Sequence, residues 1–152
     1  MRCDDLVFMM GKFPAKLPGN LRYARNHLWC QVGDRLRFGF TAYAIRLMQD
    51  VYFLEWHLSP GPVEMLQEIG FIESSKANSA LFAPLTGTIT QFNQALMNDP
   101  SLINVDGYGE GWLFEMEASP GLLMTAEQYQ RYLDENWEKT QALIKGKINA
   151  ED

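Results

Sequence analysis

The feature of this sequence that most constrains its fold is a series of short segments in which every second residue is hydrophobic. This period of two runs through residues 35–40 and recurs in 51–56 and 112–117, and Gly, Pro and Asn residues separate the segments. A period of two is typical of strands that bury one face. Many short strands of this kind predict a mainly β fold, built as a small sandwich or barrel.

The period lengthens near the C-terminus, where hydrophobic residues fall on one helical stripe. The stripe consists of Ala126, Tyr129, Leu133, Trp137, Ile144 and Ile148. Thr125 and Gln128 have the spacing of a capping box, which predicts the start of a C-terminal helix. A shorter helix is expected at Thr41–Met48, with Thr41 as its N-cap.

The first 20 residues show neither the period of two of a strand nor the period of a helix. Phe13–Asn20 contain two prolines and a glycine, which interrupt regular structure. We expect residues 1–20 to form a leader that lies over the domain or frays. Residues 21–150 are expected to form one domain that includes the C-terminal helix.

Length and charge exclude several classes of protein. A chain of 152 residues can bury a core without metals or disulfides. Its formal net charge of −6 would repel nucleic acid and anionic membrane surfaces. No hydrophobic run approaches the ~20 residues of a membrane-spanning helix. Asp4 and Asp5 stand where a targeting peptide would be basic, so we expect a cytoplasmic protein.

The cysteines and histidines predict neither a disulfide framework nor a metal site. The chain has two of each, and both cysteines, Cys3 and Cys30, are expected to be reduced thiols. His27 and Cys30 have a spacing that metal ligands can have. A zinc site of four such ligands would need every histidine and cysteine in the chain, so no metal is expected.

One lysine is isolated from all the others. The lysines are Lys12, Lys16, Lys76, Lys139, Lys145 and Lys147, so Lys76 is the only one across the β region. It lies among small and polar residues between two hydrophobic runs, Ile69–Ile72 and Ala80–Ala83. This placement predicts an exposed hairpin tip. An exposed lysine is usually plain solvated surface, but a hairpin tip also suits a modification site that an enzyme must reach.

Gly70–Ala77 resemble the lipoylation motif of the glycine cleavage H-protein family, in which a glutamate and a serine shortly precede a lysine–alanine pair. The resemblance extends in collinear order over about residues 21–133. It includes His27-Leu28-Trp29, Gly39–Ala44, Asp50–Phe53, Ala83–Gly87, Tyr108–Leu113 and Leu123–Tyr129. A collinear set of this length is far more specific than the lysine motif alone.

This resemblance implies the barrel-sandwich hybrid fold of biotinyl and lipoyl carriers, and the role of a carrier rather than an enzyme. It implies lipoate joined to Lys76 by an amide. Glu73, Ser74 and Ala77 would flank the lysine and take part in its recognition, and Asn26 and His27 would line a cleft for the arm.

The resemblance also implies partners. The arm would shuttle an aminomethyl group from a pyridoxal-phosphate glycine decarboxylase to a tetrahydrofolate-dependent aminomethyltransferase. A flavin (FAD) dihydrolipoyl dehydrogenase would then reoxidise it, and a lipoate ligase or lipoyl transferase would attach it. The carrier itself is expected to be a monomer.

Two positions depart from the family pattern. Acidic residues in the family stand where this chain has Leu28 and Ala80. Those acids are thought to shield the loaded arm, and an amine beside Leu28 and Ala80 would lose hydration without gaining a charged partner. Three hypotheses therefore stay open. They are a glycine cleavage H protein, an H-like carrier for lipoyl relay or for heterodisulfide-reductase-like sulfur transfer, and an unmodified interaction domain.

Gly109 and Gly111 precede a strand that begins with a large aromatic residue. This arrangement predicts a tight turn whose glycines adopt positive φ. A phosphate-binding loop is the alternative, but the segment Tyr108–Trp112 has no basic residue to favour it.

Overall fold

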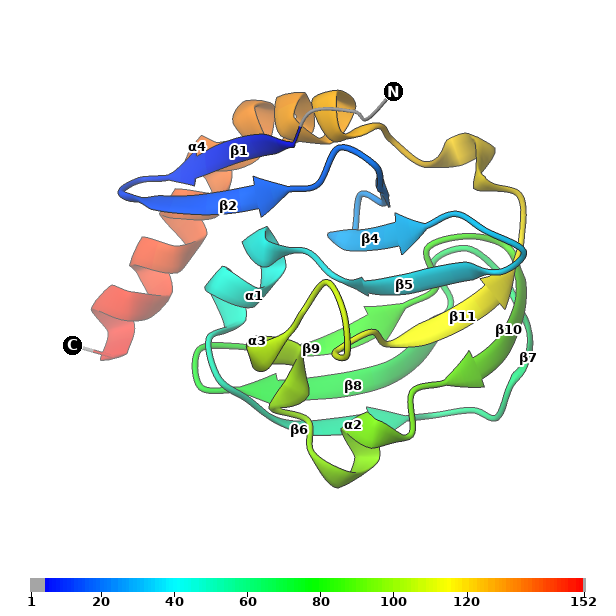
Figure 1. Ribbon diagram of the computed structural model, residues 1–152. Helices are drawn as coiled ribbons and strands as arrows, with labels where there is room; N and C mark the ends of the chain where they lie inside the picture. Colours follow the sequence, from blue (N-terminus) through cyan, green and yellow to red (C-terminus); the bar gives the residue numbers. More distant parts are fainter. Residues whose placement is uncertain (1–4, 152) are drawn as a thin grey trace.

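Two facing β-sheets make up the centre of the protein (Figure 1). The computed structural model describes residues 5–151, and the side chains of residues 5–140. The larger sheet has the order β3-β4-β5-β11-β10-β7, and the smaller has the order β6-β8-β9. The strands of the larger sheet are β3 Arg22–Tyr23, β4 Leu28–Gln31, β5 Leu36–Phe40, β7 Gly61–Val63, β10 Gly87–Phe92 and β11 Phe114–Glu117. Those of the smaller sheet are β6 Val51–Trp56, β8 Glu68–Ser74 and β9 Asn78–Phe82.

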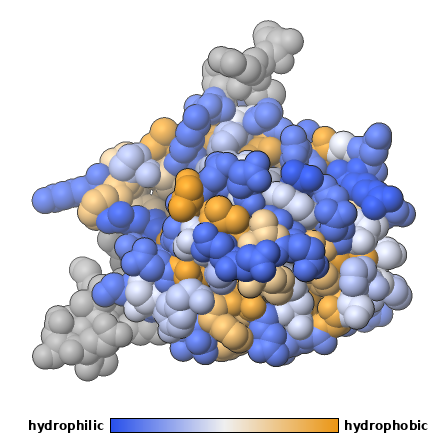
Figure 2. Space-filling view, turned by 60° about the horizontal axis from the view of Figure 1, so that its bottom comes forward, coloured by the Kyte–Doolittle hydropathy of each residue, from blue (hydrophilic) through white to orange (hydrophobic). Residues whose placement is uncertain are grey.

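Twelve large hydrophobic side chains are exposed among the described residues. Val105 and Leu122 are the most exposed of them, at 76% and 75%. On the face shown in Figure 2, hydrophobic residues form small patches separated by hydrophilic ones. Isolated exposed apolar residues of this kind are normal for a protein surface.

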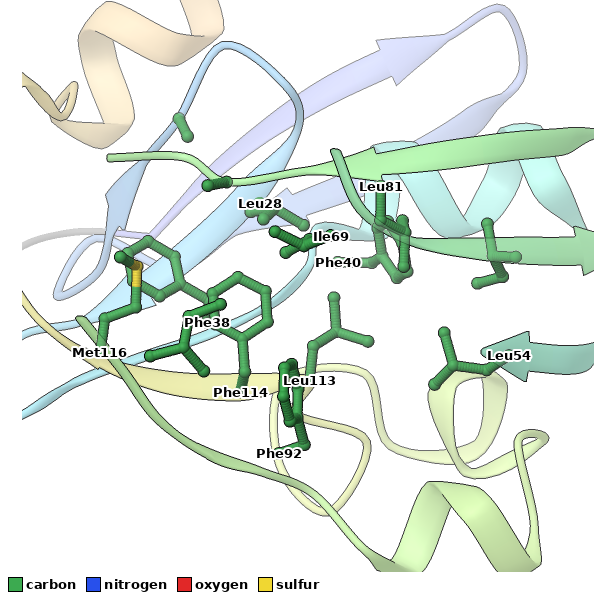
Figure 3. Packing of buried hydrophobic residues seen from close by; sticks show 14 of the residues in the cluster. Leu28, Phe38, Phe40, Leu54, Ile69, Leu81, Phe92, Leu113, Phe114 and Met116 are labelled. Carbon is green, nitrogen blue, oxygen red and sulfur yellow. The ribbon is translucent and has the colours of Figure 1, made fainter. Parts of the chain in front are cut away.

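The main core lies between the two sheets (Figure 3). Phe38 and Phe114, on neighbouring strands of the larger sheet, stack with ring centroids 5.3 Å apart. Ile69 and Ile72 enter from β8 in the smaller sheet, and both are fully buried. The prediction of a mainly β fold with a C-terminal helix is confirmed. The two sheets form a sandwich, without closing into one hydrogen-bonded barrel.

Both predicted helices are present with the predicted caps. Helix α1 is Ala42–Met48, and the Thr41 side chain accepts a hydrogen bond from the Ala44 N–H at 3.2 Å. Helix α4 is Ala126–Glu151. Thr125 and Gln128 exchange hydrogen bonds of 2.9 and 3.2 Å, which confirms the capping box. Ile144 and Ile148, predicted on the apolar stripe of this helix, lie outside the described side chains.

Three short helical turns were not predicted. They are α2 (Ala95–Asn98), α3 (Leu102–Val105) and η1 (Pro120–Leu122). Each is a single turn, too short for a helical period to show in the sequence. They lie in the loops on either side of β11.

The segment before residue 20 forms an antiparallel hairpin of β1 (Leu6–Met10) and β2 (Phe13–Leu17). Gly11 in its turn has a φ of +65°, a conformation that favours glycine. The hairpin lies against α4, as Figure 1 shows, and also contacts α1. Of the two alternatives for residues 1–20, the described part therefore lies over the domain. The domain boundary at residue 20 stays a prediction.

A second core holds the hairpin in place. Phe8 and Met10 from β1 pack with residues of α1, β4 and α4 in one buried cluster. The Phe8 ring meets the Trp137 ring edge-on, with centroids 5.5 Å apart. Strand β1 and the first half of α4 are thus joined in this second core.

The prediction of positive φ at Gly109 and Gly111 is wrong. Among the described glycines only Gly11 has a positive φ. The structure gives a steric reason for these glycines instead. A Cβ added at Gly109 would lie 2.4 Å from a carboxylate oxygen of Asp106, and one at Gly111 would lie 2.6 Å from the Leu102 carbonyl oxygen. At Gly111 the close atoms belong to the backbone, so a larger residue has no room. At Gly109 the Asp106 carboxylate would have to move and give up its hydrogen bond from the Glu110 N–H.

Candidate functional site

Lys76 lies at an exposed turn between β8 and β9, which confirms the predicted hairpin tip. The turn is closed by Ser74, whose buried hydroxyl accepts a hydrogen bond from the Ala77 N–H at 3.1 Å. The same hydroxyl donates to the Ala77 carbonyl at 2.7 Å. Serine favours turns because its side chain can replace backbone partners in this way.

Hydrogen bonds join the backbone of this turn to the segment between α1 and β6. The Lys76 N–H donates to the Met48 carbonyl at 3.1 Å, and the Ser75 N–H donates to the Asp50 carbonyl at 2.9 Å. The Asp50 N–H in turn donates to the Ser75 hydroxyl at 3.1 Å. The backbone of the lysine is therefore fixed, while its side chain is exposed.

The residues predicted to flank the lysine occupy different environments. Ser74 is only 4% exposed and is used within the turn. Ala77 is half-buried, and Glu73 is half-buried on β8 between Phe53 of β6 and Asn78 of β9. The structure therefore gives Ser74 a role in forming the turn. Recognition of these residues by a modifying enzyme stays a prediction.

A cleft of about 360 Å³ opens beside the turn, between β9 and the segment of chain from Asn26 through α1. Met48 accepts the hydrogen bond from the Lys76 N–H, and Ala77 follows Lys76 in the sequence. Both residues are part of the wall of the cleft. The whole lining is Asn26, His27, Leu28, Phe40, Ala44, Leu47, Met48, Ala77, Ser79, Ala80, Leu81, Phe82, Leu113 and Phe114. The structure thus brings Asn26 and His27 onto one cleft next to the lysine turn.

His27 is held in an unusual backbone conformation, with a φ of +68°. Its N–H donates to the Ala24 carbonyl at 3.0 Å, and its own carbonyl accepts from the Thr41 N–H at 3.1 Å. A left-handed conformation at a residue other than glycine is uncommon and often marks a functional position.

A chain of hydrogen bonds orients the His27 ring. Nδ1 lies 2.9 Å from the Tyr129 hydroxyl, which lies 3.0 Å from the Thr41 hydroxyl. The Thr41 hydroxyl also accepts from the Ala44 N–H at 3.2 Å. Both hydroxyls can donate and accept, so the direction of the chain follows the tautomer of the His27 ring.

Burial keeps this network neutral. It lowers the pKa of His27 from 6.5 to about 4, so the imidazole is uncharged at pH 7. Burial also raises the pKa of Tyr129 well above 10, so its hydroxyl stays protonated. His27 therefore adds no charge to the cleft under neutral conditions.

The Asn26 amide links the cleft wall to β9. Its Nδ2 donates to the Phe82 carbonyl at 3.0 Å, across the open edge of the strand. Its Oδ1 is buried and has no hydrogen-bond partner among the described residues. Leaving a buried acceptor without a donor costs about 1–3 kcal/mol.

Comparison with known proteins identifies the family. A family model described as glycine cleavage H-protein matches residues 21–136. The chain belongs to the glycine cleavage H-protein family. The glycine cleavage system H protein of Herpetosiphon aurantiacus is 36% identical over 128 residues, which cover 82% of this chain and 99% of that protein. That of Corynebacterium aurimucosum is 38% identical over 122 residues, covering 76% and 94%.

A solved structure agrees with this assignment. The crystal structure of a glycine cleavage system H protein from Mycobacterium marinum matches with a TM-score of 0.68 and 31% identity. The match covers 78% of this chain and 98% of that one. The hairpin of β1 and β2 precedes the range that the family model matches.

Family membership settles the type of role. The chain is a lipoyl-carrier component of the glycine cleavage system and not itself an enzyme. Proteins of this family carry lipoate, so the hard chemistry belongs to the cofactor and to the enzymes that act on it. The resemblance inferred from the sequence is confirmed.

Other chemistry finds little support at this site. Among the described residues no group of three or more His, Cys, Asp or Glu side chains could hold a metal. Burial raises the pKa of Cys30 to about 12, so this thiol is protonated at pH 7. Cys3 lies outside the described residues. Within residues 5–151, no helix has the length and hydrophobicity to cross a membrane.

Sequence reasoning missed the supporting residues. Tyr129 was assigned only to the apolar stripe of the C-terminal helix, yet its hydroxyl bonds His27, 102 positions away. Thr41 was identified as a helix cap but not as a partner of Tyr129. No local pattern in the sequence signals contacts across such separations.

Proposed function

We propose that Lys76 carries lipoate through an amide, and that this chain shuttles an aminomethyl group between the enzymes of glycine cleavage. The observation that carries the proposal is an exposed lysine on a firmly held turn, beside a mainly hydrophobic cleft. It is the only lysine between Lys16 and Lys139. Acylation removes its charge, which suits an arm that lies against hydrophobic walls.

The residues around Lys76 fit such a group. Because the turn is exposed, a lipoate ligase or lipoyl transferase can reach the amine. Glu73, Ser74 and Ala77 are proposed to form the surface that this enzyme recognises. When bound, lipoate supplies a disulfide that accepts the aminomethyl group and is later restored by oxidation of the dithiol. The chain contributes the tether, and Asn26 and His27 line the cleft beside it.

The proposed partners follow from this cycle. They are a pyridoxal-phosphate glycine decarboxylase, a tetrahydrofolate-dependent aminomethyltransferase and an FAD-containing dihydrolipoyl dehydrogenase. The cytoplasmic location and the monomeric state expected from the sequence stay predictions. Size-exclusion chromatography with light scattering tests the monomeric state.

Attachment is tested by mass spectrometry. After expression with lipoate, the intact mass should rise by one lipoyl group, and peptide mapping should place it on Lys76. Lys76→Arg should remove the adduct and change stability by no more than about 0.5 kcal/mol, as expected at an exposed site. An adduct on Lys12, Lys16 or Lys139 with Lys76 bare would refute the proposal.

A second candidate function is favoured by one observation. Among the side chains that the structure describes, no acidic one lines the cleft, where Leu28 and Ala80 are part of the wall. A carrier with an uncharged cleft suits cargo other than an amine, such as a relayed lipoyl group or sulfur for a heterodisulfide-reductase-like complex. Release of CO₂ from glycine by a purified glycine decarboxylase distinguishes the aminomethyl role from the other cargoes. If the aminomethyl role holds, the lipoylated protein should support this release of CO₂, and the Lys76→Arg variant should not.

The third hypothesis, an unmodified interaction domain, conflicts with membership of a lipoyl-carrier family. It predicts that protein purified from cells that supply lipoate carries no adduct on any lysine, which the same mass measurement tests.

A further inference from the structure

The outer face of the smaller sheet, on the side away from the main core, is acidic and aromatic. Leu54 and Ile72 belong to the core, and side chains alternate along a strand, so their neighbours point outward. These neighbours, here called the outer patch, are Phe53 and Glu55 of β6 and Phe71 and Glu73 of β8. Phe53 is 40% exposed and Glu55 is exposed, while Phe71 and Glu73 are half-buried.

The polar groups of the outer patch are not used within the protein. Among the described side chains, neither Glu55 nor Glu73 forms a salt bridge. Both rings lie outside the two hydrophobic cores. The strand register places Phe53 opposite Glu73 and Phe71 opposite Glu55, so each ring has a carboxylate beside it. The patch therefore presents two aromatic rings and two carboxylates to solvent.

Arginine is the side chain that best fits this combination. Its planar guanidinium can bond a carboxylate and stack on an aromatic ring at the same time. The protein contains such an arrangement on its larger sheet, where Arg37 donates to Glu115 at 2.9 Å and lies 4.3 Å from the Trp112 ring centroid. A partner surface that presents arginines would make the same contacts with the outer patch.

The distribution of charge along the chain favours the same partner. Residues 47–82 include all three strands of the smaller sheet and contain five acidic residues, with Lys76 as their only lysine or arginine. Residues 1–46 contain eight lysines and arginines and three acidic residues. Figure 1 shows the hairpin of β1 and β2 toward the top of the molecule and β6 and β8 toward the bottom. The field of the protein therefore turns the smaller sheet toward a positively charged surface.

We propose that the outer patch is a docking surface for an enzyme that presents arginines beside the entrance to its active site, and that glycine decarboxylase is this enzyme. Strand β8 runs from Phe71 through Glu73 into the turn that holds Lys76, so a partner seated on the patch lies next to the arm. The patch guides the approach, and the arm carries the cargo. This inference rests on the proposed function, which makes glycine decarboxylase a partner.

The kinetics of binding to purified glycine decarboxylase of the same organism, measured by surface plasmon resonance, test the proposal. Glu55→Gln should lower the association rate constant about two- to fivefold at about 20 mM salt, the effect expected of one exposed ion pair. At about 0.5 M salt this difference should disappear, because exposed charges are screened. Phe53→Ala should raise the dissociation rate constant about two- to tenfold by removing the ring on which an arginine stacks.

Two matched variants serve as controls. Glu127→Gln removes the same charge from the first turn of α4, which Figure 1 shows on the side opposite to β6. Leu122→Ala removes a hydrophobic side chain that is 75% exposed on η1, outside the patch. Both should bind like the wild type.

Two results would overturn the proposal. One is a wild-type protein that does not bind the enzyme, and the other is an equal effect of Glu55→Gln and Glu127→Gln on the association rate constant. The measurement uses the protein without lipoate, so it does not depend on attachment at Lys76. If binding follows the expected pattern but the lipoylated protein does not support release of CO₂ from glycine, the proposed shuttle is refuted and the docking surface is not.

Discussion

Protonation of His27 should destabilise the protein as the pH falls from 7 to 4. The imidazole has a pKa of about 4 in the folded protein, because it is buried, and 6.5 in the unfolded chain. Between these two values the unfolded chain binds more protons than the folded one. The contribution of the neutral His27 ring to the free energy of unfolding is therefore fully present above pH 6.5 and is lost as the pH falls toward 4.

The magnitude follows from the same two pKa values. A difference of one pH unit corresponds to about 1.4 kcal/mol, so the free energy of unfolding should fall by about 1.4 kcal/mol at pH 5.5 and about 3 kcal/mol at pH 4. This is a large part of the 5–15 kcal/mol typical of a folded domain.

Urea denaturation between pH 7 and pH 4 measures the effect, with His27→Asn as the reference. Asparagine tolerates the positive φ of this position and does not titrate. Carboxylates titrate in both proteins, so the difference between their pH profiles isolates His27. Parallel profiles, or an NMR titration that places the His27 pKa near 6.5, would refute the reasoning.

Three further predictions concern stability and use denaturation as the measurement. Gly109→Ala and Gly111→Ala should each cost about 1–3 kcal/mol through overpacking, and a neutral result at both would contradict the steric argument. Thr125→Ala should cost about 1 kcal/mol by removing the capping box, and an unchanged midpoint would show that the α4 cap is dispensable. Phe8→Ala should cost about 3–5 kcal/mol and expose the hairpin to trypsin after Lys12, and a resistant variant would show that the second core does not depend on Phe8.

The features that local sequence determines were predicted well. The hairpin tip at Lys76 follows from small and polar residues between two hydrophobic runs, and the cap at Thr41 follows from the side chain of one residue. Both depend on interactions within a few positions of the chain, which a pattern can reveal.

Features that depend on distant contacts were not predictable. The alternation in 51–56 suggested a regular strand, but a register shift between Val51 and Phe53 places Val51 and Leu54 on the buried side. Gly109 is glycine because Asp106 crowds it, and not because of its own φ. The hairpin in β1 and β2 escaped prediction because its prolines hide the period, and its buried face exists only against α1 and α4.

The second core can be completed only after helix α4 has been synthesised. Phe8 packs on Trp137, and Gln130 donates to the Val7 carbonyl across 123 positions of the chain. The ribosome makes β1 more than one hundred residues before α4, the helix that packs on it. Closing so long a loop costs entropy that only the finished contact repays. Until α4 is made, the part of the hairpin that packs on it stays uncovered, although α1 is already available to β2. In that interval Phe8 and Met10 are exposed to chaperones and proteases, whereas the finished protein buries both.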